Sequence, residues 1–176
     1  MRTLDRTNSA LLLVDFQARL MPAIHEAGAA VGNASRLLRA ATMLEVPVLA
    51  TEQNPAGLGG TVEDLKGGHP VASKMTFDAC RSPDMARVLP DKPNIVVAGC
   101  EAHVCVLQTV LGLLDLGRAV FVVRDALGSR RPESKETAVR RMERHGAEIV
   151  TTEMVVFEWL ETAEHPRFRE VMSLIK

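Results

Sequence analysis

Residues 94–116 read NIVVAGCEAHVCVLQTVLGLLDL, and this stretch indicates the fold class. Its first part, Asn94–Gly99, is apolar without alternation, which is typical of a strand covered on both faces of its sheet. Its last part, Cys105–Leu116, is apolar nearly all round and predicts a helix buried between layers or in a subunit contact. Gly117 follows where a left-handed helix terminator belongs. The stretch therefore predicts one strand–loop–helix unit.

The same unit repeats along the chain. Further apolar runs that predict buried strands are Leu11–Asp15, Val46–Thr51, Ala119–Arg124 and Glu148–Thr151, with a weaker one at Val71–Lys74. Helical patterns between or after them cover Ala29–Glu45, Ser82–Leu89, Glu133–His145, a short stretch near Glu153–Glu161, and about Pro166–Ile175. Strands that alternate with helices predict an α/β fold with a mainly parallel sheet and helices on both faces.

Two local features of this pattern are also expected. Ser82 is a candidate helix cap, because Pro83 suits the first helical position that follows it. The glycine-rich segment Gly57–Gly60 reads as part of a long loop above the sheet.

Length and composition limit the class of protein. The 176 residues fit one domain, 1–176, and 47% of them are apolar. The formal net charge is −1, without a basic stripe, which argues against nucleic acid or an anionic membrane as a partner. No apolar run approaches the roughly 20 residues of a membrane span, and the N-terminus does not resemble a secretory signal. The three cysteines fit a reducing compartment, so we expect a cytoplasmic protein.

Ligands of open parallel sheets bind beyond the carboxyl ends of the strands, at the switch in strand order. The segments expected there are Asp15, the stretch from Thr51, Gly99–Cys105 and Arg124–Arg131. Asp15 ends an otherwise apolar strand, where burying a carboxylate costs desolvation energy unless it is paired or has a function. It is a candidate catalytic acid or base, or else it caps the structure that follows.

Cys105 is expected at the start of the apolar helix. The unpaired N–H groups of a helix N-terminus favour a thiolate, which is the nucleophilic form of cysteine, and could also hold an oxyanion. The alternative is a small buried hydrophobe, which is the interpretation that we give to Cys80 and Cys100.

Three further polar features could contribute to a site. Lys74 could reach the strand ends, lower the pKa of a thiol and move a proton, or else it is a solvated surface lysine. His103 is interpreted as pocket lining rather than as a base, since residues two apart near a helix start rarely face each other. The run Arg124–Arg131 could bind an acidic substrate or form a structural salt-bridge loop. The sequence has no CxxC, HExxH, GxGxxG or Walker motif, so neither a metal nor a nucleotide cofactor is predicted.

Asp15, Lys74 and Cys105, in this order at three strand ends, resemble the Asp–Lys–Cys triad of the isochorismatase-like cysteine hydrolases. The resemblance covers nearly the whole chain. Its marks are ALLLVDFQ, TEQNPAGLG, KMTF around Lys74, GCEAHVCVLQT around Cys105, and VVRDALGSR. The GxEAHVC form and the closing HPRFREVMSLIK look most like the uncharacterised isochorismatase domain-containing branch, which is also found in animals.

The resemblance implies a three-layer αβα sandwich with a six-stranded parallel sheet and a metal-independent hydrolase. Asp15 would be the base that takes the thiol proton and later activates water. Lys74 would stabilise the charged groups, and Cys105 would be the nucleophile that forms a covalent intermediate. The oxyanion hole would use the backbone N–H groups of Cys105 and Glu101. A cis peptide bond between Cys100 and Glu101 would precede the second of these groups.

Departures from the family pattern narrow the chemistry. Nicotinamidases carry an Asp/His/His metal site after the second strand, where this chain has TEQNPAGLGG without histidine, so zinc and nicotinamidase activity are not expected. Isochorismate-cleaving members act on a vinyl ether and do not need the cysteine. Cys105 therefore points to a small amide, ureido or related C–N bond as the substrate.

Two other functions stay open: a non-catalytic binding or assembly protein on the same scaffold, and a thiol redox protein in which Cys105 forms sulfenic acid or a disulfide with Cys100. The residues expected to line a substrate pocket are Phe16, Gln53, Leu58, Phe77, Glu101 and His103. A homo-oligomer of at least two chains is expected from the family and from the very apolar helix.

Overall fold

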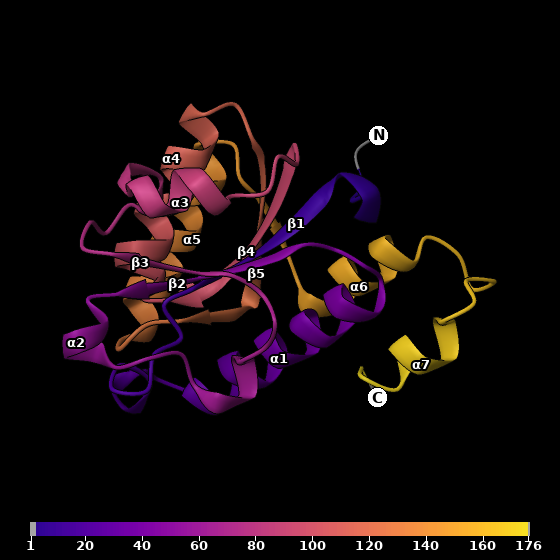
Figure 1. Cartoon of the computed structure of the whole chain (residues 1–176), viewed down its shortest axis with the longest axis horizontal. Coiled ribbons are helices and arrows are strands. Elements are labelled where there is room, and N and C mark those ends of the chain that lie inside the picture. Colours follow the sequence, from indigo (N-terminus) through magenta and orange to yellow (C-terminus); the bar gives the residue numbers. More distant parts are fainter. Residues whose placement is uncertain (1–2, 176) are drawn as a thin grey trace.

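A computed structural model describes residues 3–175 and contains one six-stranded sheet (Figure 1). The strand order is β3-β2-β1-β4-β5-β6, and each neighbouring pair is parallel. The strands are β1 (Ser9–Val14), β2 (Val48–Gln53), β3 (Val71–Lys74), β4 (Asn94–Cys100), β5 (Ala119–Gly128) and β6 (Glu148–Val150). The chain runs outward from β1 to β3 and then returns to β4. The switch in strand order therefore lies between β1 and β4, where ligands of such sheets bind.

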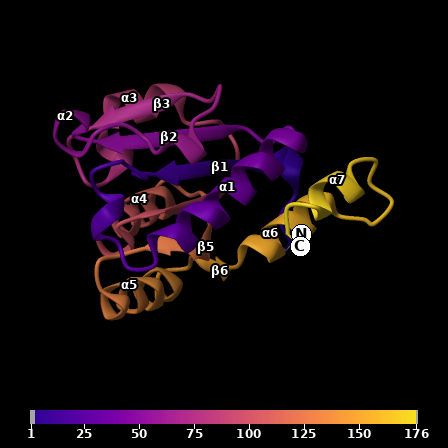
Figure 2. The ribbon, with the colours of Figure 1, turned by 90° about the horizontal axis from the view of Figure 1, so that it is seen from below.

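Helices cover both faces of the sheet, which confirms the predicted three-layer αβα sandwich (Figures 1 and 2). One face packs against α1 (Ala27–Met43) and α6 (Thr152–Leu160), and the other packs against α4 (Leu107–Asp115) and α5 (Pro132–Arg144). Side chains alternate along β1, so that Leu11 and Leu13 enter the first core while Leu12 and Val14 enter the second. Since both faces are covered, the strands need apolar residues at every position, as their sequences predicted.

The remaining helices are short. They are α2 (Pro55–Leu58), α3 (Pro83–Val88) and α7 (Phe168–Met172). Figure 2 shows α7 beyond the end of α6, away from the strand ends at which α2 lies. No helix within residues 3–175 has the length and apolar character that crossing a membrane requires.

Most predicted elements are confirmed, with changed ends. β5 runs four residues beyond the predicted Ala119–Arg124, and β2 lies two residues later than the predicted Val46–Thr51. Gly117 has φ +75°, which confirms it as the left-handed helix terminator. The predicted one-domain organisation of 1–176 stays a prediction, and residues 1, 2 and 176 lie outside the described residues.

Two local predictions are wrong, and a third is confirmed only in part. α4 begins at Leu107 instead of Cys105, because Ala102–Val106 forms a π-helical turn before it. The expected long loop includes α2, since Pro55 occupies its first turn and Asn54 precedes it. Ser82 is the N-cap residue of α3, but its side chain makes no capping bond, and its hydroxyl donates instead to the backbone oxygen of Ser73 at 3.4 Å.

Candidate active site

A buried ion pair lies at the carboxyl end of the sheet. Asp15 follows β1 and Lys74 ends β3, and Lys74 Nζ lies 2.7 Å from Asp15 Oδ2. Both side chains are fully buried. Burying two charges costs desolvation energy, which is offset only when hydrogen bonds satisfy the remaining lone pairs and protons. The neighbouring strand β2 supplies these bonds.

Each charged group of the pair has further partners. Asp15 Oδ1 accepts a hydrogen bond from Thr51 Oγ1 at 2.7 Å. Lys74 Nζ donates to Gln53 Oε1 at 2.8 Å and to the Thr76 carbonyl oxygen at 3.4 Å. The ammonium therefore uses its three donors on three acceptors. This network fixes the pair in one geometry.

Asp15 has a backbone conformation that few non-glycine residues adopt. Its φ is +52°, in the left-handed region, which Asp and Asn tolerate better than other side chains. Such a residue costs of order 1–3 kcal/mol and persists where the surrounding structure holds it. Here the Asp15 N–H donates to the Thr51 carbonyl oxygen at 3.1 Å, and Thr51 also binds the carboxylate. The turn directs the carboxylate to the strand ends rather than into a helix cap.

Cys105 reaches the same place from β4. The peptide bond between Cys100 and Glu101 is cis, and the π-helical turn Ala102–Val106 follows it. At Gly99 a Cβ atom would lie 2.5 Å from the carbonyl oxygen of Val14, so only glycine allows β4 to approach the end of β1 this closely. Cys105 is buried, with 6% of its surface exposed.

The electrostatics of Cys105 connect it to the ion pair. The pKa of its thiol is raised to about 12, first by burial and then by the negative charge of Asp15, while Lys74 lowers it. A thiol hydrogen bond to Asp15 also raises this pKa. The thiol is thus protonated at neutral pH and next to a carboxylate that can accept its proton.

The raised pKa does not fit the thiolate expected at a helix N-terminus. Cys105 lies in the first helical turn, Ala102–Val106, which continues into α4, but burial and the charge of Asp15 raise the pKa of its thiol. The pKa values of Cys80 and Cys100 are also raised to about 12, mainly by burial. What distinguishes Cys105 is the contact with Asp15 and Lys74.

Glu101 is held at both its side chain and its carbonyl group. Its Oε2 accepts hydrogen bonds from the backbone N and the Nε of Arg130, both at 3.0 Å. Its carbonyl oxygen accepts from the N–H groups of Val104 and Val106 at 3.1 and 3.2 Å. The segment between β4 and α4 is thereby tied to the segment that follows β5.

The predicted pocket residues lie on different segments of the fold. Gln53 joins the network around Lys74, whereas Phe16 packs in the core on the α1 face. Leu58 lies on α2, and Phe77 is 51% exposed. His103 Nδ1 lies 3.0 Å from Ser129 Oγ, and the residue lines a cavity of about 290 Å³ beside α5.

A cavity of about 400 Å³ borders Lys74. Its other lining residues include Met75, Thr76, Arg81 and Ser82. The Met75 side chain is 72% exposed beside it. The cavity gives the strand end at Lys74 an opening to the surface.

Sequence reasoning missed two residues of the network. Thr51 binds Asp15, and Gln17 braces β2: Gln17 Nε2 donates to the carbonyl oxygens of Gln53 and Gly59 at 3.0 and 2.6 Å. The Gln53 N–H donates back to Gln17 Oε1 at 2.8 Å. The sequence feature that could have identified both residues is a polar side chain at or just after the end of a buried strand, as at Asp15.

The run Arg124–Arg131 forms ion pairs within the chain. Arg124 Nη2 lies 2.9 Å from Glu136 Oε1, and Arg130 pairs with Glu101. These contacts favour the structural interpretation of the run over the binding of an acidic substrate. Within residues 3–175, no three His, Cys, Asp or Glu side chains gather as metal ligands.

Known proteins resemble this chain over nearly its full length. An isochorismatase domain-containing protein 2 of Xenopus laevis is 38% identical over 175 residues, which cover 98% of this chain and 85% of that protein. An isochorismatase domain-containing protein 1 of Danio rerio is 36% identical over 178 residues, covering 98% of this chain and 62% of that protein.

Solved structures share the fold. A MAR1 ribonuclease from Caenorhabditis elegans has a TM-score of 0.92 and 37% identity, covering 98% of this chain and 92% of its own. YcaC from Pseudomonas aeruginosa, solved with hexane-2,5-diol and covalent acrylamide, has a TM-score of 0.90 and 26% identity, covering 98% and 91%. The Escherichia coli YcaC gene product is an octameric hydrolase of unknown specificity with a TM-score of 0.88 and 26% identity, covering 98% and 96%.

The isochorismatase domain model matches residues 9–154, which include Asp15, Lys74 and Cys105. This match covers well over half of the chain, and the relatives exceed 30% identity across 98% of it. The fold, with its parallel six-stranded sheet, is also that of the solved structures. The chain therefore belongs to the isochorismatase domain family.

Proposed function

We propose that this protein is a cysteine hydrolase that cleaves a small amide, ureido or related C–N bond. One observation carries the proposal: at the switch point of the sheet, a buried carboxylate–ammonium pair lies near enough to the buried thiol of Cys105 to shift its pKa. Nucleophilic catalysis needs a nucleophile, a base within reach of its proton and a group that orients the base.

In the acylation step, Asp15 accepts the thiol proton while Cys105 Sγ forms a bond to the substrate carbonyl carbon. The carbonyl oxygen takes up the negative charge. When the C–N bond breaks, the amine leaves with the proton that Asp15 held, and a thioester remains on Cys105. A proton transfer to the attacked or leaving group contributes about 10²–10⁴-fold in rate.

In the deacylation step, Asp15 removes a proton from water, whose oxygen attacks the thioester carbon. The acid leaves, and the proton returns to Cys105. Lys74 orients Asp15 in both steps and stabilises the transient thiolate. The contacts of Thr51 and Gln53 keep this ion pair in place.

The backbone N–H groups of Glu101 and Cys105 are proposed as the oxyanion hole. The support for this role is the restraint on Glu101, whose carboxylate and carbonyl are both bonded. Donors that are held before reaction stabilise developing charge without reorganisation, and one such donor is worth about 10²–10³ in kcat.

A relative supports a reactive nucleophile that small molecules can reach. The Pseudomonas aeruginosa YcaC structure contains covalent acrylamide, which reacts with nucleophiles at its double bond and not at its amide bond. We extend this to a small-molecule substrate for the present chain, which acts without metal or cofactor. Of the pocket residues that the sequence indicated, Gln53 accepts a hydrogen bond from Lys74.

A second candidate is ribonuclease activity, because the nematode relative is named a MAR1 ribonuclease. The net charge of −1 gives little attraction to the phosphate backbone of RNA. Incubation with single-stranded RNA separates the two candidates: cleavage that requires Cys105 would replace the amide hydrolase proposal.

The redox alternative is weaker on geometric grounds. Cys100 belongs to the core on the α1 face, whereas Cys105 belongs to the core on the α4 face. The sheet thus separates their side chains, and all three cysteines are free. Free thiols agree with the proposed cytoplasmic location. A homo-oligomer remains part of the proposal, and the octameric YcaC supports it.

The proposal is tested with a panel of small amides and ureido compounds. Cys105→Ala should abolish hydrolysis, while Cys80→Ala, a matched change at a half-buried thiol, should leave it within about twofold. Hydrolysis that persists in Cys105→Ala would contradict the proposal. If the wild type hydrolyses nothing in the panel, the non-catalytic binding protein becomes the better account.

A further inference from the structure

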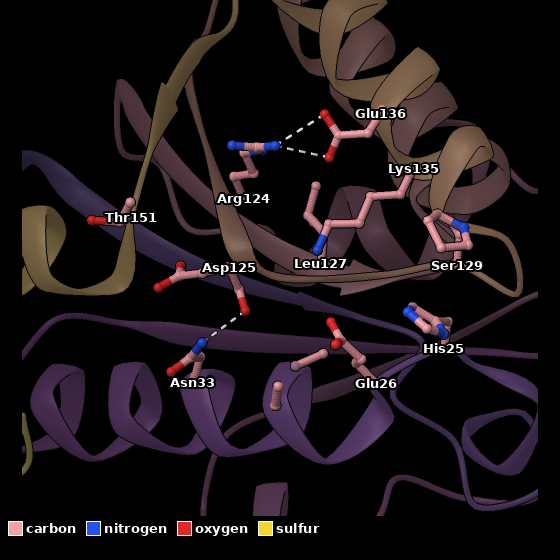
Figure 3. A pocket seen from close by; sticks show the side chains of 13 residues that line it. His25, Glu26, Asn33, Arg124, Asp125, Leu127, Ser129, Lys135, Glu136 and Thr151 are labelled. Carbon is pink, nitrogen blue, oxygen red and sulfur yellow. Dashed lines mark hydrogen bonds and ion pairs between the residues drawn. The ribbon is translucent and has the colours of Figure 1, made fainter.

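A second cavity lies at the other side of the sheet's carboxyl end, between α1 and α5 (Figure 3). It has a volume of about 400 Å³, and its lining does not include Asp15, Lys74 or Cys105. The cavity arises from unequal strand lengths. β6 pairs only with Phe121–Val123, so the part of β5 from Arg124 onward has no β6 partner.

Part of this strand edge is already used. The Asn33 side chain on α1 donates to the Asp125 carbonyl oxygen at 2.8 Å. Asp125 Oδ1 accepts from the backbone N and the Oγ1 of Thr152, at 2.9 and 3.0 Å, and so supports the start of α6. These contacts build the floor and one end of the cavity.

The charged groups of the wall fall into two sets. Arg124 Nη2 binds both carboxylate oxygens of Glu136, at 2.9 and 3.0 Å, so these two charges neutralise each other. The ammonium of Lys135 and the carboxylate of Glu26 make no hydrogen bond or ion pair within residues 3–175. Figure 3 shows Lys135 reaching into the cavity from α5 and Glu26 facing it from the start of α1.

Lys135 lacks a sufficient counter-charge. Burial lowers the pKa of its ammonium, and the nearby Arg124 adds to this, while Glu136 and Asp125 oppose it. A ligand carboxylate at Lys135 would supply the missing negative charge. Across the cavity, Glu26 would accept a hydrogen bond from a cationic amine. His25 also lines this wall, and Ala29, Ala30 and Leu127 provide apolar surface between the two charged groups.

We propose that this cavity is a binding site for a small zwitterion of amino-acid size, which places its carboxylate on Lys135 and its amine on Glu26. The volume of about 400 Å³ lies in the range of small-molecule sites. Opposite charges on facing walls favour a ligand that carries both charges over one that carries either alone. The site is separate from the proposed hydrolase site, so each can fail without the other.

The test is calorimetric titration of the full chain with glycine, β-alanine, 4-aminobutyrate and 6-aminohexanoate, which differ in charge separation. At least one should bind, and butyrate and butylamine should bind about tenfold more weakly or worse, since each lacks one charge-assisted bond. Lys135→Met and Glu26→Gln should each weaken the best ligand about 10- to 100-fold. The matched surface changes Lys92→Met and Glu170→Gln should leave its affinity unchanged.

Several results would overturn the proposal. One is no binding of any member of the series at about 10 mM. Another is binding that neither cavity variant weakens, which would place the ligand elsewhere. Equal affinity for butyrate and 4-aminobutyrate would show that Glu26 does not recognise the amine. Thermal unfolding of each variant checks that a loss of binding is not a loss of fold.

Discussion

Asp15→Asn should make Cys105 more reactive toward an alkylating agent and less active in catalysis. The substitution keeps the size of the side chain and removes the charge that raises the pKa of the Cys105 thiol. A unit charge about 4 Å away, at an effective dielectric constant of about 20, contributes about 4 kcal/mol, or about three pKa units. Burial, the largest cause of the raised pKa, remains in the variant, so the pKa of Cys105 should fall from about 12 by up to about three units.

The assay is the rate of Cys105 alkylation by iodoacetamide as a function of pH, followed by peptide mass. Near pH 8 the thiolate fraction should rise by up to about a thousandfold in the variant. A thiolate of lower pKa is intrinsically less nucleophilic, so the alkylation rate should rise by up to about 40-fold. Amide hydrolysis should fall by about 10²–10⁴-fold in the same variant, because the base that takes the thiol proton is lost.

Asp78→Asn is the matched control. Asp78 raises the pKa of Cys80 through its charge and a hydrogen bond, so this change should accelerate alkylation of Cys80 and leave Cys105 unaffected. An unchanged alkylation profile of Cys105 in Asp15→Asn, in a variant that still folds, would refute the reasoning. So would hydrolysis that survives the loss of the carboxylate.

Three further predictions concern the supports of the site. Lys74→Met leaves the buried carboxylate of Asp15 unpaired and should lower the free energy of unfolding by about 3–5 kcal/mol, as measured by urea denaturation. Arg130→Ala should lower kcat about tenfold with little change in KM, because it removes a hydrogen bond to the Glu101 carboxylate and so loosens a residue whose N–H is a proposed oxyanion donor. Arg124→Ala, which breaks a different ion pair, should leave kcat unchanged. Gly99→Ala should prevent folding or cost more than about 3 kcal/mol in thermal unfolding, since its Cβ would meet backbone at 2.5 Å; a near-native Tm would contradict this.

Much of the fold follows from the sequence because β1 and β4 are buried on both faces and must be apolar throughout. The same rule places Asp15 at a strand end, and Lys74 lies at the end of the weakest predicted strand. The ends of β5 and β2 were less predictable, because the polar residues there are held by contacts with distant segments. Asp125, for example, supports the start of α6.

The site was predictable in its residue types and less so in its electrostatics. A helix N-terminus predicted a thiolate at Cys105, but that prediction did not include the charge of Asp15 or the burial of the thiol. Thr51 was missed because threonine in a strand is common for reasons of strand propensity alone. The bond from Gln17 to β2 joins residues 36 positions apart, a distance at which no local pattern gives a signal.

The central claim is that Cys105 carries the substrate's acyl group during turnover. It is tested most directly by acid-quenching the wild-type protein while it hydrolyses an amide found active in the panel, and by measuring the mass of the Cys105 peptide. The account predicts that this peptide gains the mass of the acyl group, and that the peptides of Cys80 and Cys100 do not. Two results would contradict the account. One is an acyl group on another residue, and the other is rapid amide hydrolysis by a Cys105→Ala variant.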